Sequence, residues 1–490
     1  MADSADDRKA VCEVGVDQKN AMKRTAAALL LTCALLAGMA AAAFAKGADD
    51  PTPTTTTETA PTATDTTTTV PEPPPTTTTP TTPTVPSSPT VPAINYGVAD
   101  DTGKYADDGG AWFDGMLTGA NLTEVRWTLA YDPANPTGID ELPFLQRAAP
   151  QAEKDGVHVV LALYARPARV HNPAAFCGWA GQVATTVAQW GIHDFIVWNE
   201  PNTALYWSPQ TVGSPTEYEA LLAKCYDTIH AADADARVIG MALSPRSNGP
   251  TQTAPIPFIL GVGAAYRRSG RLLPIMDQMS VHPYPNPNSP TDGPNVGYSN
   301  SDFYGVSNLD RVKQAVWEAF HGTGQPTTMD GLTFRIDELG WQTTTPAALY
   351  PQYYNQENVA VVQQQTQAND IAQAVERYFA CDPAVTDVEW FLLVDEPTRN
   401  GRDQSGKSIG GGWQSGFLTA GGQGVSTPKL SYSEDAALFA AGRSACTGGI
   451  INWAPGTQTS RTTKAQGRRT GRKSALRDAA EPPLGNYPFT

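Results

Sequence analysis

Two glutamates, about 140 residues apart, each follow directly on a short apolar run. Glu200 lies within Phe195–Asn202 (FIVWNEPN), and Glu338 lies within Leu332–Trp341 (LTFRIDELGW). Such runs are typical of buried parallel strands, so the pattern predicts that two strands deliver two carboxyl groups to one pocket. Two carboxyl groups suffice to hydrolyse a glycosidic bond, because one protonates the leaving oxygen while the other presents negative charge to the anomeric carbon.

The separation of the two carboxyl groups decides the stereochemistry of such a reaction. A gap of about 5–5.5 Å lets one carboxylate attack and retains the anomeric configuration, whereas about 6.5–9.5 Å admits a water molecule and inverts it. The sequence does not fix this gap. The opposing interpretation is that Glu200 and Glu338 are ordinary surface or ion-paired groups, but the neighbouring Trp198, Asn199 and Trp341 favour a site.

The elements that must position these groups recur between residues 93 and 455 as a short apolar run, a polar loop and a longer amphipathic stretch. Eight such units predict a (β/α)8 TIM barrel of the α/β class with long βα loops, in which strand C-termini face the active site. The expected strands are Ile94–Ala99, Glu124–Leu129, Val157–Tyr164, Asp194–Asn199, Arg237–Leu243, Gln278–His282, Leu332–Glu338 and Val388–Val394.

Helical periodicity is clearest in Glu217–Ala232, Leu309–Phe320 and Val359–Phe379. A doubly wound open sheet is the alternative architecture. It is disfavoured because the first expected strand runs into Asn95–Asp100 (NYGVAD), which lacks the glycine-rich phosphate turn of that fold.

The two glutamate segments resemble the signatures of a known group of enzymes. Trp198–Asn202 (WNEPN) with the following Trp207 resembles the fourth-strand acid/base signature of the retaining glycoside hydrolases of clan A. Ile336–Trp341 (IDELGW) resembles the seventh-strand nucleophile segment of that clan, with Asp337 where Thr is more usual. Within the clan, the pattern is nearest the cellulase-like family 5 and the family 39 β-xylosidase and exopolysaccharide-hydrolase groups.

The resemblance implies a role for several residues. Glu200 would be the acid/base, Glu338 the nucleophile, and Asn199 a donor to the sugar 2-hydroxyl. Arg126, in the second strand, would keep the nucleophile ionised, with a structural salt bridge as the alternative. Asp337 is expected on the opposite side of its strand.

Further binding residues are expected around this pair. His282 and Tyr284 match a sixth-strand His-x-Tyr pattern, in which Tyr supports the nucleophile and His touches the substrate. Trp390 resembles the platform beneath the sugar at the cleavage point. Trp207, Trp341 and Trp413 fall in expected loops on the same face, where rings stack on sugars. The alternative is a capping role for His282 and plain packing for the tyrosine and the tryptophans.

We do not expect the two ends of the chain to fold. Residues 1–21 precede a basic start and an Ala/Leu run (22–45) that is typical of a secretory signal peptide, so they represent an extension or a misassigned start. An uncleaved membrane anchor is the alternative for 22–45. Residues 46–92 are a Thr/Pro-rich linker that we expect to be disordered, and 456–490 form a basic tail that is also expected to be disordered.

Charge and cysteine content narrow the class of protein. The formal net charge of −15 argues against a nucleic-acid partner. Four cysteines remain beyond the signal segment, which fits an oxidising compartment. They allow three connectivities, of which we favour Cys177–Cys225 with Cys381–Cys446. No cysteine or histidine spacing indicates a metal site, and no cofactor is expected.

The residue pattern predicts a secreted or cell-surface glycoside hydrolase, and the resemblance to clan A implies a retaining one. We expect it to be a monomer that acts on a β-linked polysaccharide or oligosaccharide. The linker or tail could associate with the cell wall, and the long loops leave endo and exo action open. The alternatives are a catalytically silent barrel that binds wall or capsular glycan, and a metal-dependent barrel hydrolase, which would need histidines and carboxylates that converge on several strand ends.

Overall fold

The computed structural model describes residues 91–165, 172–246, 252–286, 289–354, 360–399 and 412–456. The predicted signal segment, the basic tail after residue 456 and all of the Thr/Pro-rich linker before residue 91 lie outside the described residues.

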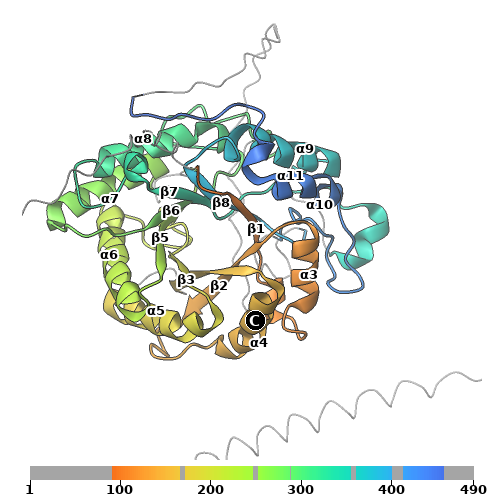
Figure 1. The fold of residues 1–490 in the computed structure, drawn as a ribbon, viewed down its shortest axis with the longest axis horizontal. Coiled ribbons are helices and arrows are strands. Elements are labelled where there is room, and N and C mark those ends of the chain that lie inside the picture. Colours follow the sequence, from red (N-terminus) through yellow and green to blue (C-terminus); the bar gives the residue numbers. More distant parts are fainter. Residues whose placement is uncertain are drawn as a thin grey trace, which may run out of the picture. The chain divides into compact units, whose positions relative to one another are not determined.

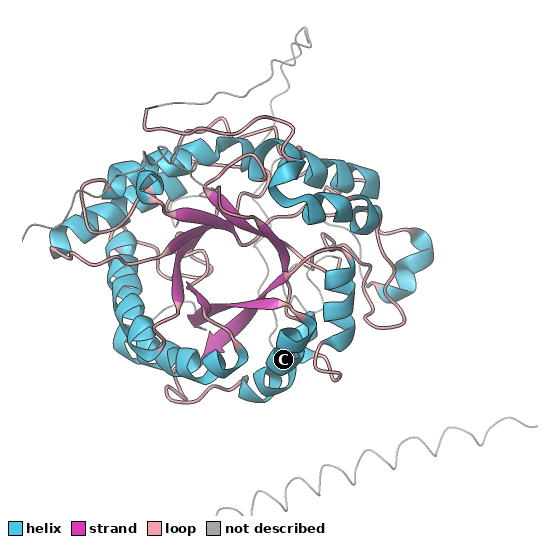
Figure 2. Cartoon of the chain, in the orientation of Figure 1, coloured by secondary structure: helices cyan, strands magenta, loops and turns pink. Residues whose placement is uncertain are grey.

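Eight parallel strands close into a barrel in simple sequence order, and helices surround them (Figure 1). Figure 2 shows the ring of strands inside the outer ring of helices. The predicted (β/α)8 TIM barrel is therefore confirmed. The strands are β1 (Asn95–Ala99), β2 (Glu124–Tyr131), β3 (His158–Ala165), β4 (Asp194–Val197), β5 (Arg237–Leu243), β6 (Gln278–Val281), β7 (Thr333–Ile336) and β8 (Val385–Trp390).

The outer layer contains the three helices that the periodicity predicted. Two of them begin or end within a few residues of the expected bounds, and the third starts at Gln364 and finishes as a π-helical turn over Val375–Phe379. The α-helices are α2 (Thr102–Tyr105), α3 (Ala111–Gly119), α4 (Leu142–Asp155), α5 (Pro173–Val187), α6 (Ser214–Ala232), α7 (Pro255–Ser269), α8 (Leu309–Phe320), α9 (Gln364–Ala374), α10 (Leu430–Glu434) and α11 (Ala436–Ala441).

The core has two layers because side chains alternate along each strand. In β3, Leu161 and Leu163 belong to the large apolar layer between the strands and the helices. Val160 and Ala162, which alternate with them, join a small cluster inside the barrel. Every residue of β3 except the first is buried, which explains why the strand reads as a continuous apolar run.

Strand β8 corrects the sequence prediction, which placed this strand at Val388–Val394. The true strand begins at Val385 and carries Asp387 and Glu389, whose charged side chains interrupt the apolar pattern expected of a buried strand. The apolar run at 391–394 belongs instead to the loop that follows. There, the backbone N–H groups of Leu393 and Val394 donate to Oδ2 of Asp100, so the run is held against the end of β1.

Two disulfides brace the outer layer. Cys177 on α5 is bonded to Cys225 on α6, and Cys381 is bonded to Cys446, so both predicted pairs are confirmed. None of the helices in the described part of the chain has the length and hydropathy that a membrane span requires.

Candidate active site

Glu200 is held at the C-terminal end of β4 by an unusual backbone. Trp198 and Glu200 adopt φ angles of 75° and 38°, and Met241 and Ala242 at the end of neighbouring β5 adopt 82° and 40°. Residues other than glycine rarely occupy this left-handed region, and they do so mainly at functional sites. The Glu200 N–H donates to the Ala242 carbonyl over 2.9 Å. The two strained strand ends therefore fix each other.

Glu338 lies two residues beyond the end of β7 and is bound from two sides. An Nη1–H group of Arg126, on β2, donates to Oε1 over 3.0 Å, and the Tyr284 hydroxyl, beyond β6, donates to Oε2 over 3.2 Å. Burial raises the pKa of Glu338, and nearby His282 and Arg126 oppose this effect. Four separate segments thus bring the predicted residues to one end of the barrel.

Asn199 is also placed by Arg126. Its Oδ1 accepts a hydrogen bond from Nη2 of Arg126 over 2.9 Å. Because the carbonyl oxygen is engaged, the amide N–H groups of Asn199 are left for another acceptor. The guanidinium of Arg126 thereby binds Glu338 itself and Asn199, the residue before Glu200.

His282 joins the two glutamates. Its Nδ1 lies 3.1 Å from Oε1 of Glu200 and 3.6 Å from Oε2 of Glu338. The ring is completely buried, whereas the side chains of Glu200 and Glu338 are 12% and 14% exposed. Both carboxyl groups can therefore be reached from solvent, while His282 contacts them from beneath. The predicted contact between His282 and a substrate stays a prediction.

Asp337 corrects the expectation that it points to the opposite side of its strand. Its Oδ2 lies 3.3 Å from Nε of Arg126, and its Oδ1 lies 3.1 Å from Nε2 of His282. The side chain has no exposed area. Strand β7 ends at Ile336, so the alternation of side chains that a strand imposes does not extend to Asp337 and Glu338.

Trp390 also departs from its predicted role. Its side chain is 1% exposed and packs with Phe379 and Phe439 between the strands and the helices. The following residue, Phe391, faces the other way and contacts the ring of Trp413 at a centroid distance of 5.4 Å. The sequence interpretation was one residue out of register, which in a strand reverses the direction of the side chain.

Two of the predicted loop tryptophans are packing residues in this structure. Trp207 is 5% exposed and packs on Trp198, and its Nε1–H donates to Oε2 of Glu217. Trp341 is 1% exposed, and its Nε1–H donates to the Asp292 carbonyl over 2.9 Å. Neither ring has an open face on which a sugar could stack.

Trp413 is the one predicted loop tryptophan that remains partly exposed, and it adjoins the glutamates through Tyr284. The two rings lie 5.4 Å apart, and Tyr284 in turn binds Glu338. An aromatic patch of Phe391, Tyr284 and Trp413 thus borders Glu338.

Sequence reasoning missed a third carboxyl group beside this patch. Oε2 of Glu396 accepts a hydrogen bond from the Trp413 N–H over 2.7 Å. Burial raises the pKa of Glu396 to about 8, with Asp100 and Asp395 adding to the shift. The sequence contained a signal that could have found Glu396. Like Glu200 and Glu338, it comes shortly after an apolar run at the end of a strand–loop unit.

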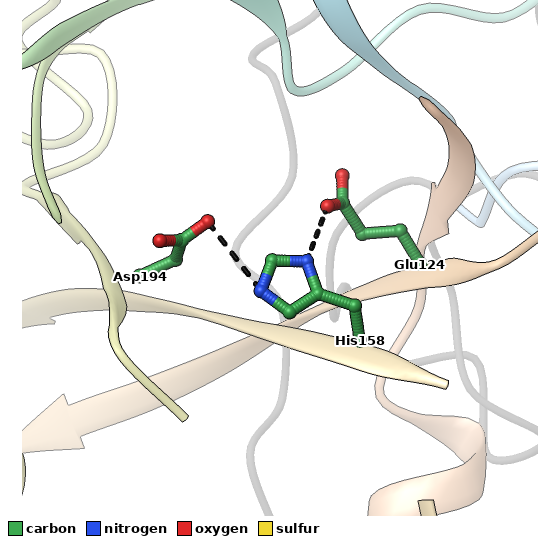
Figure 3. A group of neighbouring side chains, drawn as sticks. All are labelled: Glu124, His158 and Asp194. Carbon is green, nitrogen blue, oxygen red and sulfur yellow. Dashed lines mark hydrogen bonds and ion pairs between the residues drawn. The ribbon is translucent and has the colours of Figure 1, made fainter. Parts of the chain in front are cut away.

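A separate cluster occupies the opposite, N-terminal end of the barrel. Glu124, His158 and Asp194 bring ligand atoms within 4.8 Å of one another, a spacing that could hold a metal ion (Figure 3). However, the guanidinium of Arg335 lies between the acids and pairs with Glu124 and Asp194. The charge that a metal would supply is therefore already present, and we interpret the cluster as a buried ion-pair network.

Comparison with known proteins supports the fold. No protein-family model matches the sequence, and no curated protein matches it. Among solved structures, GH5_18 from Streptomyces cattleya, in complex with GlcNAc, is 12% identical, with 74% of this chain and 83% of that chain covered and a TM-score of 0.50.

Two further solved structures are similar over most of this chain. A family 39 glycoside hydrolase from Bacteroides cellulosilyticus is 17% identical, with 71% and 63% of the two chains covered and a TM-score of 0.47. This chain thus spans less than two thirds of that protein. A monomeric β-xylosidase from Caulobacter crescentus is 14% identical, with 71% and 69% covered and a TM-score of 0.44. At 12% identity, the similarity to GH5_18 shows the barrel fold alone.

Proposed function

We propose that this protein is a retaining glycoside hydrolase in which Glu200 is the acid/base and Glu338 the nucleophile. The contact of one histidine nitrogen with both carboxylates carries the proposal. Because Nδ1 of His282 lies 3.1 Å and 3.6 Å from the two oxygens, these lie less than about 7 Å apart, a bound that includes the gap of about 5–5.5 Å for direct attack and excludes most of the wider range of about 6.5–9.5 Å for inversion.

The surroundings of Glu338 suit a nucleophile. In the first step, a carboxylate oxygen of Glu338 would bond to the anomeric carbon as the glycosidic C–O bond breaks, while Glu200 gives its proton to the leaving oxygen. Arg126 and Tyr284 bind one oxygen each, so the carboxylate is held at a fixed orientation. In the described part of the chain, His282 contacts Oε1 of Glu200, which leaves Oε2 to exchange a proton.

The second step would reverse these roles. Glu200, now a carboxylate, would take a proton from a water molecule, whose oxygen attacks the anomeric carbon and releases Glu338. Double inversion at this carbon returns the original configuration. The amide N–H groups of Asn199 would donate to the sugar 2-hydroxyl, since its carbonyl oxygen is already bound by Arg126.

For the substrate, we propose an extracellular β-linked polysaccharide or oligosaccharide. The signal-like segment and Thr/Pro-rich linker in the sequence support export, and the two disulfides fit an oxidising compartment. The aromatic patch beside Glu338 offers an apolar surface suited to the face of a pyranose ring.

Product stereochemistry tests the mechanism. Hydrolysis is screened on aryl β-glycosides and polysaccharides, and the first-formed anomer is followed by NMR; we expect retention. Glu200→Gln should slow substrates with poor leaving groups by about 10²–10⁴-fold, and activated aryl glycosides much less in the first step. Inversion would refute the two-step mechanism, and binding without hydrolysis across the panel would instead support a glycan-binding barrel.

A further inference from the structure

Asp337 has no place in the mechanism above, yet it is buried against two of its residues. It lies beside Nε of Arg126 at 3.3 Å and beside Nε2 of His282 at 3.1 Å. Its carboxylate is fully buried, and the Arg126 guanidinium and the His282 ring both lie within ion-pair distance of it. A buried carboxylate that is paired in this way stays ionised, and the two cations lower the pKa of Asp337 despite its burial.

The carboxylate of Asp337 determines which protons His282 carries. Nε2 lies 3.1 Å from a carboxylate oxygen of Asp337, at ion-pair distance without an aligned hydrogen bond, and the nearby negative charge favours a proton on Nε2 over a lone pair. The other nitrogen, Nδ1, faces carboxyl oxygens of Glu200 and Glu338. A ring enclosed by three carboxyl groups is most stable with a proton on both nitrogens.

The remaining neighbours of His282 do not offset this charge. The backbone N–H of His282 donates to the Tyr304 hydroxyl over 3.1 Å, and burial raises the pKa of Tyr304 well above its usual value, so it stays neutral. Tyr284 packs edge-on against the ring at 6.4 Å. Burial alone would lower the pKa of His282, but Asp337 and Glu338 outweigh it and raise this pKa to about 10.

We propose that Asp337 is a positioning residue of the active site, which keeps His282 a cation that donates a hydrogen bond from Nδ1 to Glu200. The inference rests on the proposed function, and it states where the protons of His282 and Glu200 lie. Because Oε1 of Glu200 accepts this bond, the acid proton of Glu200 is confined to Oε2, the oxygen left for the leaving group. A neutral His282 would accept at Nδ1 and draw that proton towards the ring.

The arrangement also keeps the charge of the site constant through both steps. Arg126 and His282 contribute two positive charges, which Asp337 and ionised Glu338 balance while Glu200 is protonated. When Glu338 becomes an ester, Glu200 becomes the carboxylate and the balance holds. Without Asp337, the site would carry an excess positive charge, which opposes the positive charge that develops on the sugar in an oxocarbenium-like transition state.

The first test measures His282 without any substrate. The chain contains six histidines, and His282→Gln assigns the ring-nitrogen NMR signals of this one. We expect His282 to remain doubly protonated through neutral pH in the unmodified protein. In Asp337→Asn, which conserves size and removes the charge, its pKa should fall by one unit or more. An ordinary histidine titration in the unmodified protein, or no change in the variant, would overturn the proposal.

Kinetics supply the second test. In Asp337→Asn, the alkaline limb of the kcat/KM profile should move to lower pH, since His282 loses its proton sooner; a shift of one unit is about a tenfold loss at a pH on that limb. Asp233→Asn is the matched control, because Asp233 pairs with His193 over 2.7 Å on the outer layer. It should leave the profile unchanged.

The variants also distinguish a failure of this proposal from a failure of the proposed function. If Asp337→Asn does not fold, Asp337→Thr and the titration of the unmodified protein still decide the outcome. A protonated His282 in a protein that hydrolyses no glycoside would overturn the proposed function while supporting the Asp337–His282 pair. An active enzyme whose alkaline limb is the same with and without Asp337 would overturn the positioning role alone.

Discussion

Arg126 reaches from strand β2 to Glu338, beyond the end of β7, and donates to its Oε1 over 3.0 Å. This contact lowers the pKa of a carboxyl group that burial otherwise raises. The same guanidinium binds Asn199 beside Glu200. Arg126 therefore orients Glu338 directly and orients Asn199, the neighbour of Glu200.

Replacing Arg126 should shift the pH dependence in a defined direction. In Arg126→Gln, Glu338 loses a positive neighbour, its pKa rises, and the acid limb of the kcat/KM profile moves to higher pH. Loss of orientation should lower kcat/KM by about 10²-fold at the optimum. Arg147→Gln, on helix α4, removes a guanidinium that binds the Ala106 carbonyl and should leave the profile in place. An unshifted acid limb in Arg126→Gln would show that this pairing does not tune the nucleophile.

The two glutamates could be predicted because each ends an apolar run within a recognisable motif. The role of Trp390 could not be predicted correctly. Asp387 and Glu389 interrupt the apolar pattern of β8, so the apolar loop that follows resembles the strand more than the strand itself does. Asp337 was misplaced because the sequence does not show that β7 ends at Ile336. In each case, the error concerned where a strand ends, which decides the direction of every side chain beyond it.

Trp390 and Trp413 should respond differently to truncation. Trp390→Ala removes a ring that is fully buried between strands and helices, so the free energy of unfolding should fall by about 3–5 kcal/mol. Trp413→Ala removes a partly exposed ring beside Tyr284, so kcat/KM should fall about 3–10-fold with little change in stability. Denaturant unfolding and steady-state kinetics measure both effects. A kinetic loss in folded Trp390→Ala larger than that in Trp413→Ala would restore the original assignment.

The buried network at the N-terminal end of the barrel should be a stability element. Arg335 is fully buried, and Arg335→Met would remove a cation that pairs with several acids, leaving Arg237 beside two of them: the acids are Glu124, Asp194, Asp387 and Glu389. Breaking such a network costs about 3–5 kcal/mol in the free energy of unfolding.

An exposed ion pair is the control for this stability prediction. Arg271 pairs with Asp227, whose side chain is 48% exposed, and Asp227→Asn, which leaves the bonds of Arg271 to the Leu273 and Pro274 carbonyls in place, should cost less than about 1 kcal/mol. Urea unfolding at neutral pH compares the two variants. Equal losses would contradict the interpretation of the N-terminal cluster, and so would a divalent cation that stabilises the unmodified protein specifically through Glu124 and His158.

The central claim is that Glu338 attacks the anomeric carbon, and trapping the covalent intermediate tests it most directly. A 2-deoxy-2-fluoro glycosyl fluoride of the sugar that the screen identifies should react once and stay attached, because the fluorine destabilises the oxocarbenium-like transition state and slows release. Peptide mapping by mass spectrometry should place the added sugar on Glu338, and Glu338→Ala should abolish labelling. Attachment to a different residue, or turnover with inversion and no adduct, would contradict the account.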